Sequence, residues 1–339
     1  MLNASGDPLP NTAAARAKRL HKSLLVWDNH ACLPMDASRN LDQLPQIHRF
    51  AQAGCDMVSI NIGYGEIAHA HHISLAKQMA DWIDARTQSL LRVTSVEDIQ
   101  VARRDQRLAV AFDIEGAAVI RDLGDVQVFY DLAVRWMSLA YNRNNPYAGG
   151  CHDDDHGLSH AGKDLVAEME RVGMTVCCSH VGYHTIEDVL HVASKPVILS
   201  HSNPRGLTDH PRNVPDALLK GIAETGGVIG VNGLKLFLGA DYDAVRVCEH
   251  ALYLLNLLGD RAVGFGLDYV FDREEIDAEK SGMSDTFPSG WGYEEPVRCF
   301  DTNDWPAITA RLLGHGLSEN TLKNVLGQNW LRVATACWQ

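Results

Sequence analysis

Eight short apolar runs, each followed by a polar or amphipathic stretch, recur along the chain from residue 24 onward. This alternation is typical of βα units built around a parallel sheet. Eight units favour a closed α/β fold, a TIM-like (β/α)8 barrel, in a single domain covering residues 1–339. An open doubly wound sheet is the alternative, although no G-x-G-x-x-G follows the first run. The runs are Leu24–Asp28, Met57–Ile62, Leu108–Ile114, Trp136–Tyr141, Met174–Ser179, Pro196–Ser200, Val228–Asn232 and Ala262–Leu267.

Between the runs, amphipathic spacing predicts helices over residues 74–91, 162–172, 185–193, 215–224 and 243–258. Residues 1–20 are polar and are predicted to form a flexible N-terminal extension. Residues 271–300 are rich in Asp, Glu, Gly and Ser and are predicted to form a long loop after the last barrel strand. Long loops in compact domains are often functional lids.

The composition excludes several classes of function. Lys and Arg number 30 against 43 Asp and Glu, which gives a net charge of −13 and argues against nucleic-acid binding. No run of about 18 apolar residues is present, so we expect no membrane span. The N-terminal residues lack the apolar core of a secretory signal, and eight scattered cysteines show no disulfide spacing. We therefore expect a cytoplasmic protein with reduced thiols.

Catalytic groups of such barrels sit at the carboxyl ends of the strands. Five of the eight predicted strands end in side chains that can bind a metal. Because those ends meet at one rim, a shared metal site is expected there. The residues are Asp28, His30 and Cys32 after the first run, Asp113 and Glu115 after the third, His180 after the fifth, His201 after the sixth and Asp268 after the eighth.

The positions of the histidines are the strongest evidence for a metal site. His30 and Cys32 are two residues apart, so both side chains point to the same face of an extended chain. Imidazole and thiolate are ligands that suit zinc. Taken alone, Cys32 could equally be a buried thiol that binds no metal. His180 and His201 follow neighbouring strands, which lie about 4.7–4.9 Å apart, and are close enough to share an ion.

The carboxylates extend this hypothesis. Glu115 beside imidazoles would be costly to bury unless it met a cation, and it could bridge two metals. Asp268 is a candidate ligand or general acid/base. Asp28 and Asp113 either orient ligands or make structural hydrogen bonds. Two bridged metals would activate a hydroxide and polarise a carbonyl, which is hydrolytic chemistry.

Several segments resemble the renal (membrane) dipeptidase family of zinc-dependent hydrolases, which fold as (β/α)8 barrels. The resemblance runs from the first predicted strand to the last helix, and its most specific part is the pair SHV and SHS followed by HPRNVPD. The matching segments are DNHACLP at 28–34, IEGA at 114–117, the block at 157–233, GFGLD at 264–268 and ENTLKNVLGQNWLRV at 319–333.

The resemblance implies roles for individual residues. It implies two zinc ions, with His30 on the first, Glu115 bridging both, and His180 and His201 on the second. It also implies that Arg212 holds the substrate carboxylate, a task suited to a guanidinium. Asp268 would act as the proton shuttle, taking a proton from a zinc-bridging hydroxide or water and passing it to the leaving amine.

Two positions depart from the family pattern. Cys32 stands where the family has an aspartate, so either the thiol binds the first zinc or that site is weak or empty. Tyr141 stands where the family has a histidine for the substrate carbonyl, and a phenol donates one hydrogen bond but is no cation near neutral pH. We assign Tyr141 to catalysis and substrate binding on this alignment. His152 and His156 either compensate or belong to a solvated loop.

The leading hypothesis is a zinc hydrolase of a dipeptide or dipeptide-like amide. One alternative keeps the metals but assigns another amide, such as an N-acyl amino acid, because of Tyr141 and Cys32. Another is a non-hydrolytic, metal-binding relative. Related barrels often pair, which allows a homodimer, although the sequence shows no diagnostic seam.

Overall fold

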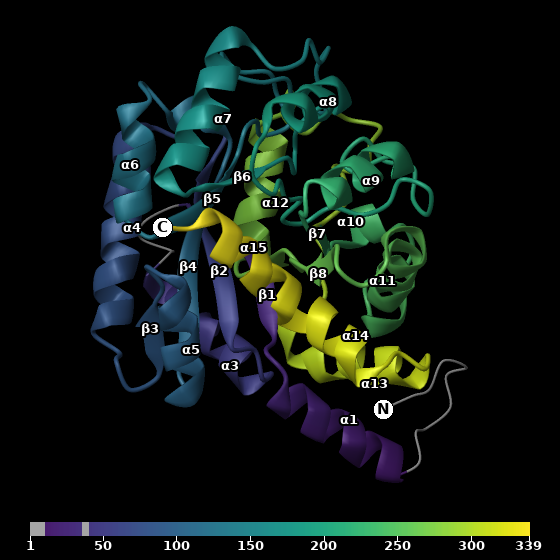
Figure 1. Cartoon of the computed structure of the whole chain (residues 1–339). Helices are drawn as coiled ribbons and strands as arrows, with labels where there is room; N and C mark the ends of the chain where they lie inside the picture. The colour runs from purple at the N-terminus through teal and green to yellow at the C-terminus, as the bar shows by residue number, and fades with distance from the viewer. Residues whose placement is uncertain (1–10, 36–40) are drawn as a thin grey trace.

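The structure is a computed structural model that describes residues 11–35 and 41–339. Seven parallel strands follow one another in the order β6-β5-β4-β2-β1-β8-β7. The ends of this series are joined by the run at 196–200, where Ile198 pairs with Cys177 of β6 and Leu199 pairs with Ile229 of β7. The predicted (β/α)8 barrel is therefore confirmed (Figure 1). The strands are β1 (Trp27–Cys32), β2 (Met57–Tyr64), β4 (Leu108–Glu115), β5 (Val134–Ser138), β6 (Thr175–Cys177), β7 (Ile229–Val231) and β8 (Val263–Phe265).

Two short strands were not predicted. β3 (Leu90–Arg92) pairs with the first half of β4, and β9 (Tyr269–Val270) pairs with the end of β1. The helix predicted over 74–91 is α4 (His69–Asp84), which ends before β3. Leu90 and Leu91 continue the apolar pattern of that helix, but they hydrogen-bond to β4 instead, with Leu90 opposite Leu108.

Helices surround the strands, and four predicted helices match α7, α8, α9 and α11 within two residues at each end. Ser159 caps α7 by accepting from Gly162 N, and Gly173 ends it in the left-handed conformation. Besides α4, the helical elements are α1 (Asn11–Ser23), η1 (Leu44–Ile47), α3 (His48–Gln52), α5 (Val96–Arg104), η2 (Ala117–Val119), α6 (Gly124–Asp131), α7 (His160–Val172), α8 (Tyr183–Val192), α9 (Asp216–Glu224), α10 (Lys235–Leu238), α11 (Ala244–Leu258), α12 (Arg273–Gly282), η3 (Thr302–Asp304), α13 (Trp305–Gly314), α14 (Glu319–Lys323), η4 (Asn324–Gln328) and α15 (Asn329–Cys337).

Two apolar layers hold the barrel together. The larger cluster lies between the strands and the surrounding helices. The smaller one fills the barrel interior, where Trp27, Met57 and Trp136 from the strands pack with Trp330 of α15. α15 crosses in front of the strands in Figure 1. Because α15 packs on residues near the strand starts, it covers the end of the barrel opposite the carboxyl ends of the strands.

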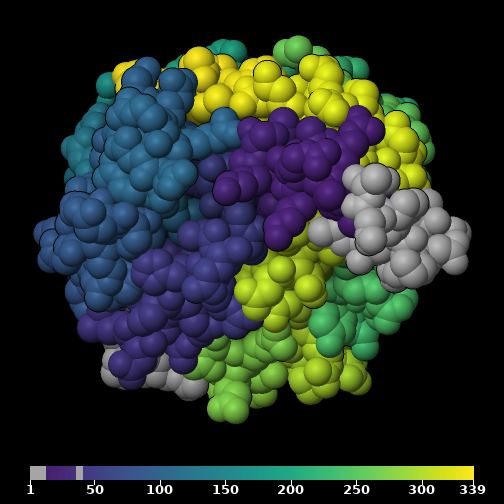
Figure 2. Space-filling view, turned by 90° about the horizontal axis from the view of Figure 1, so that it is seen from below, coloured from purple at the N-terminus to yellow at the C-terminus, as the bar shows by residue number. Residues whose placement is uncertain are grey.

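The prediction of a flexible extension over residues 1–20 is wrong from residue 11 onward; residues 1–10 lie outside the described part. α1 packs against α13, and Figure 2 shows it against the C-terminal helices. His21 explains the anchoring, because its ring nitrogens lie 2.7 Å from Thr309 Oγ1 and 2.8 Å from the Ala53 carbonyl oxygen.

The prediction of a long loop over 271–300 is also wrong in part, because α12 lies within it. Asp272 caps this helix by accepting from Glu275 N, and acidic residues in its first turn and Lys280 in its last turn suit the helix dipole. The segment is tied back to the barrel, since Lys235 N donates to Arg298 O at 2.8 Å and Phe300 N to Gly233 O at 2.9 Å.

Candidate metal centre and active site

Strand ends deliver the candidate ligands to one rim of the barrel. His30 and Cys32 end β1, and Glu115 ends β4. His180 and Asp268 each lie three residues beyond a strand, β6 and β8, while His201 follows the bridge at Leu199. All six side chains are buried except Cys32, which is half-buried.

Three histidines converge on one oxygen of Glu115. Its Oε1 lies 2.8 Å from His180 Nε2, 2.9 Å from His201 Nε2 and 3.6 Å from His30 Nε2. Although Glu115 is buried, no donor among the described residues is aligned for a hydrogen bond with this oxygen. Ligand atoms that approach one another without such alignment are arranged as they would be around a shared cation.

A second group adjoins the first through His30. Cys32 Sγ lies 3.3 Å from His30 Nε2 and 3.2 Å from Asp268 Oδ1. His30 Nε2 and Asp268 Oδ1 are 3.6 Å apart. Nitrogen, sulfur and oxygen donors together form a set that zinc accepts and that magnesium or calcium does not favour.

Each ring is held through its other nitrogen. Asn142 Oδ1 accepts from His180 Nδ1 at 2.7 Å, and Ser200 Oγ lies 2.7 Å from His201 Nδ1. Asp113 Oδ1 lies 3.2 Å from His30 Nδ1, as an ion-pair contact rather than an aligned hydrogen bond. These contacts leave every Nε2 facing the site, which is how supporting groups orient histidine ligands.

The sequence left open whether Asp28 orients a ligand or makes structural hydrogen bonds, and the structure shows structural hydrogen bonds. Its carboxylate accepts from Leu267 N at 2.8 Å and from Trp305 Nε1 at 3.1 Å. It thereby ties β1 to α13 and to the segment that follows β8. Burial raises the pKa of Asp28 to about 6, against the lowering effect of these hydrogen bonds.

Burial and neighbouring charges shift the pKa values of the candidate ligands. Burial disfavours the charged form of His30, but Glu115 and Asp113 outweigh it and raise the pKa of His30 to about 10. Burial likewise opposes ionisation of Glu115, but His30 and His180 lower its pKa to about 2. Burial lowers the pKa of both His180 and His201 well below the ordinary value, which keeps these imidazoles in the neutral form that binds metals.

Three residues of the site have a left-handed backbone conformation. His180, Asp268 and Asn142 have φ values of 69°, 56° and 60°. Few residues other than glycine adopt this left-handed conformation, and such positions concentrate at functional sites. Here the bend follows a strand and turns the side chain towards the barrel mouth.

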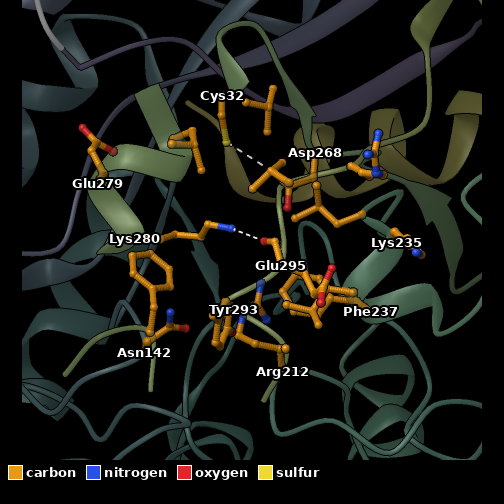
Figure 3. Close-up of a pocket in the computed structure, with 18 of the residues that line it drawn as sticks. Cys32, Asn142, Arg212, Lys235, Phe237, Asp268, Glu279, Lys280, Tyr293 and Glu295 are labelled. Atoms are coloured by element: carbon orange, nitrogen blue, oxygen red, sulfur yellow. Dashed lines mark hydrogen bonds between the residues drawn. The ribbon is translucent and has the colours of Figure 1, made fainter. Parts of the chain in front are cut away.

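A cavity of about 230 Å³ opens over these residues (Figure 3). Arg212 lies in its wall with a 2% exposed side chain, and its Nη2 is 3.0 Å from His180 Nε2. The Tyr141 ring stacks on His180, with 4.4 Å between ring centroids. Burial, followed by the charge of Glu115, raises the pKa of Tyr141 well above its ordinary range, so the phenol keeps its proton.

The cavity wall on the other side comes mainly from the 271–300 segment. Apolar side chains there include Ile276, Phe287 and Val297. Lys280 crosses this wall and donates to Glu295 O at 2.7 Å (Figure 3). The segment that sequence analysis assigned to a loop therefore forms part of the site.

The two further histidines do not line the cavity. His156 Nδ1 contacts the Gly157 carbonyl oxygen, and His152 Nε2 lies 2.8 Å from the Tyr293 hydroxyl, which does line it. Sequence analysis missed Tyr293, and also Asn142 and Asn232. Asn232 ends the seventh predicted run and donates to Asp268 Oδ2 at 2.8 Å, so a search of strand ends for amides would have found it.

Comparison with known proteins identifies the family. The family model of the membrane dipeptidases, peptidase family M19, matches residues 14–338. The chain belongs to the membrane dipeptidase family. This membership confirms the family that the sequence resemblance predicted, and it supports a metallohydrolase. No described helix of this membrane dipeptidase relative is both long and apolar enough to cross a bilayer.

Individual relatives support this membership. The protein in the pqqA 5′ region of Klebsiella pneumoniae is 31% identical over 259 residues, which cover 72% of this chain and 88% of that protein. A dipeptidase of Claviceps purpurea is 31% identical over 228 residues, covering 64% of this chain and 49% of its own. The match to a dipeptidase of Schizosaccharomyces pombe likewise covers 47% of that protein, so the chain spans about half the length of these fungal members of the membrane dipeptidase family.

Solved structures agree with the fold. An amidohydrolase from Pseudomonas aeruginosa superposes with a TM-score of 0.87 at 28% identity, covering 95% of this chain and 99% of that one. A metallopeptidase from Rhodobacter sphaeroides, liganded with a phosphinate mimic of the dipeptide L-Ala-D-Ala, has a TM-score of 0.76 at 22% identity, covering 93% and 99%. At 22% identity, the likeness to the Rhodobacter structure supports only the fold.

Proposed function

We propose that this chain hydrolyses a dipeptide or a dipeptide-like amide that ends in a free carboxylate. The observation that carries the proposal is the position of Arg212. Its guanidinium is buried in the wall of the same cavity as the metal-binding groups and contacts His180 at 3.0 Å. A buried cation next to a candidate metal ligand suits the binding of a substrate carboxylate close to the scissile bond.

The residues present fit two zinc ions. His30 and Cys32 would hold the first, His180 and His201 the second, and Glu115 would bridge them. The unaligned Glu115 Oε1 and the mixed donor set are the observations that support this fit. Bound zinc supplies a water molecule of lowered pKa and a Lewis acid for the carbonyl.

The chain's own groups would divide the remaining work. Arg212 binds the carboxylate of the substrate, and the Tyr141 hydroxyl donates to the carbonyl oxygen as negative charge develops there. Asn232 donates to Asp268 Oδ2, and Oδ1, which faces the site 3.2 Å from Cys32 Sγ, would move the proton once Cys32 binds the zinc as a thiolate. As the water oxygen bonds to the carbonyl carbon, Asp268 takes one water proton and gives it to the leaving nitrogen, and the C–N bond breaks. The second water proton passes from the new carboxylic acid to the amine, so the products leave as a carboxylate and an ammonium ion.

The wall of the cavity favours a second candidate, an N-acyl amino acid. Tyr141 brings no positive charge, and the 271–300 segment contributes Ile276, Phe287 and Val297. These side chains suit an apolar acyl group. Arg212 and Asp268 would keep the same tasks.

A substrate survey tests the proposal. Zinc-loaded protein is assayed against free dipeptides, including those with C-terminal D-residues, and against N-acyl amino acids. We expect turnover of free dipeptides, abolished by Asp268→Asn and retained by Asp209→Asn, an exposed aspartate that does not line the cavity. Turnover of N-acyl substrates alone would favour the second candidate, and turnover of neither class would refute both.

A further inference from the structure

Tyr293 is a buried cavity residue with no role in the function proposed above. Its side chain is 7% exposed, and it reaches the cavity from the 271–300 segment. Figure 3 shows Tyr293 next to Arg212. Its hydroxyl therefore lies on the carboxylate side of the site, whereas Tyr141 stacks on His180 at the metal side.

His152 fixes the direction of this hydroxyl. His152 Nε2 lies 2.8 Å from the Tyr293 oxygen, while His152 Nδ1 is buried and has no partner among the described residues. A buried N–H without an acceptor is more costly than a nitrogen lone pair without a donor. We therefore assign the proton to Nε2, which donates to the phenolic oxygen. The phenolic proton is then free to point into the cavity.

The surroundings keep both groups neutral and in place. Burial raises the pKa of Tyr293 well above its ordinary range. Burial, followed by the charge of Arg212, lowers the pKa of His152 to about 3. The Tyr293 ring also packs on Phe287 and His210, with centroids 5.2 and 5.6 Å away. The hydroxyl is thus a fixed donor beside a fixed cation.

We propose that Tyr293 is a specificity residue that donates a hydrogen bond to the same substrate carboxylate as Arg212, and that His152 is its positioning residue. The inference rests on the proposed function. Arg212 offers a fork of N–H donors and Tyr293 adds an O–H, which a carboxylate can accept together because it has about four lone-pair sites. A substrate with a neutral carboxamide end cannot accept them all in this way.

Binding measurements test this without relying on turnover. Isothermal titration of the zinc-loaded protein compares a phosphinate dipeptide mimic with its C-terminal carboxamide. We expect Tyr293→Phe to weaken binding of the carboxylate form by about 10- to 100-fold, the loss typical of a hydrogen bond to a charged group. Binding of the carboxamide should change by no more than about twofold. Tyr253→Phe is the matched control, because that hydroxyl bonds Asp216 away from the cavity.

His152 is tested through its dependence on Tyr293. His152→Leu should weaken carboxylate binding as Tyr293→Phe does, and the double variant should lose nothing further. His152→Gln places an N–H donor near the same point and should restore binding. In turnover assays the Tyr293 and His152 variants should raise KM for carboxylate substrates more than they lower kcat.

The outcomes separate this inference from the function on which it rests. If the unsubstituted protein binds both mimics and Tyr293→Phe changes neither affinity, the role of Tyr293 is refuted while the hydrolase proposal stands. If His152→Leu has no effect where Tyr293→Phe has one, the positioning role of His152 is refuted. An unsubstituted protein that binds neither mimic would overturn both the hydrolase proposal and this inference.

Discussion

Replacing Asn142 with glycine should weaken zinc binding at His180 without straining the backbone. Asn142 Oδ1 accepts the 2.7 Å hydrogen bond that holds the His180 ring, and both residues are buried. Asn142 has φ 60°, a conformation that glycine adopts freely, so Asn142→Gly removes the amide and introduces no backbone strain. Alanine at this position would add such strain and confuse the result.

The expected magnitude follows from the lost contact. Without Asn142, the Nδ1–H of His180 is a buried donor with no partner, at a cost of about 1–3 kcal/mol. Since about 1.4 kcal/mol corresponds to a factor of ten, zinc affinity should fall about 10- to 100-fold. Competition with a chromogenic chelator measures this for each of the two expected ions.

Asn142→Asp provides the matched control. Asn142 also donates to Thr286 O at 3.3 Å, and aspartate loses that donor just as glycine does. Aspartate keeps an acceptor for His180 and also tolerates φ 60°. Zinc affinity should therefore be retained in Asn142→Asp. Equal losses in the two variants would show that the contact with Thr286, and not the orientation of His180, matters, and would refute the reasoning.

Other predictions concern single positions. Protein loaded with Co2+ should show thiolate-to-metal charge-transfer absorption that Cys32→Asp abolishes and Cys151→Ser retains; absence of the band from the unsubstituted protein would show that the thiol is no ligand. Gly116→Ala should destabilise the fold by about 1–3 kcal/mol in urea unfolding, because φ is 111° and an added Cβ would lie 3.2 Å from Tyr141 Cβ, whereas Gly282→Ala meets no atom within 4 Å and should be tolerated. Burial lowers the pKa of His250 to about 4, so the unfolded chain binds a proton first as pH falls below 6.5 and stability drops by about 2 kcal/mol between pH 7 and pH 5. His250→Gln, which keeps a donor for Leu238 O, should remove that share of the loss; an unchanged pH dependence would contradict the assignment.

The sequence predicted the barrel, and the closeness of the candidate ligands at its rim, for one physical reason. Barrel strands are buried on both faces, so they appear as apolar runs, and the first polar residue after each run lies at the rim. That is why His180 and His201 could be placed together before any coordinates. The sixth run is the limiting case, since only Ile198 and Leu199 make bridges there.

What the sequence could not predict depends on contacts between distant segments. Tyr293 reaches the cavity because 271–300 folds back on Leu234 and Gly233, and no periodicity encodes that return. Asn142 orients His180 only because the backbone turns to φ 60° beside it. The N-terminal helix was missed because its polar face dominates its composition, while His21 is buried by contacts with Ala53 and Thr309.

The division of the cavity between two sources has a consequence for how such enzymes diversify. The candidate metal-binding groups come from strand ends scattered over the chain, whereas Ile276, Phe287, Tyr293 and Val297 come from one contiguous stretch that is hydrogen-bonded to the barrel at both ends. If the proposed function holds, exchanging that stretch between relatives would alter which substrates bind and leave the candidate metal site unchanged. Residues 271–300 therefore form a segment that recombination within this family could exchange as a unit, with boundaries near Val270 and Phe300.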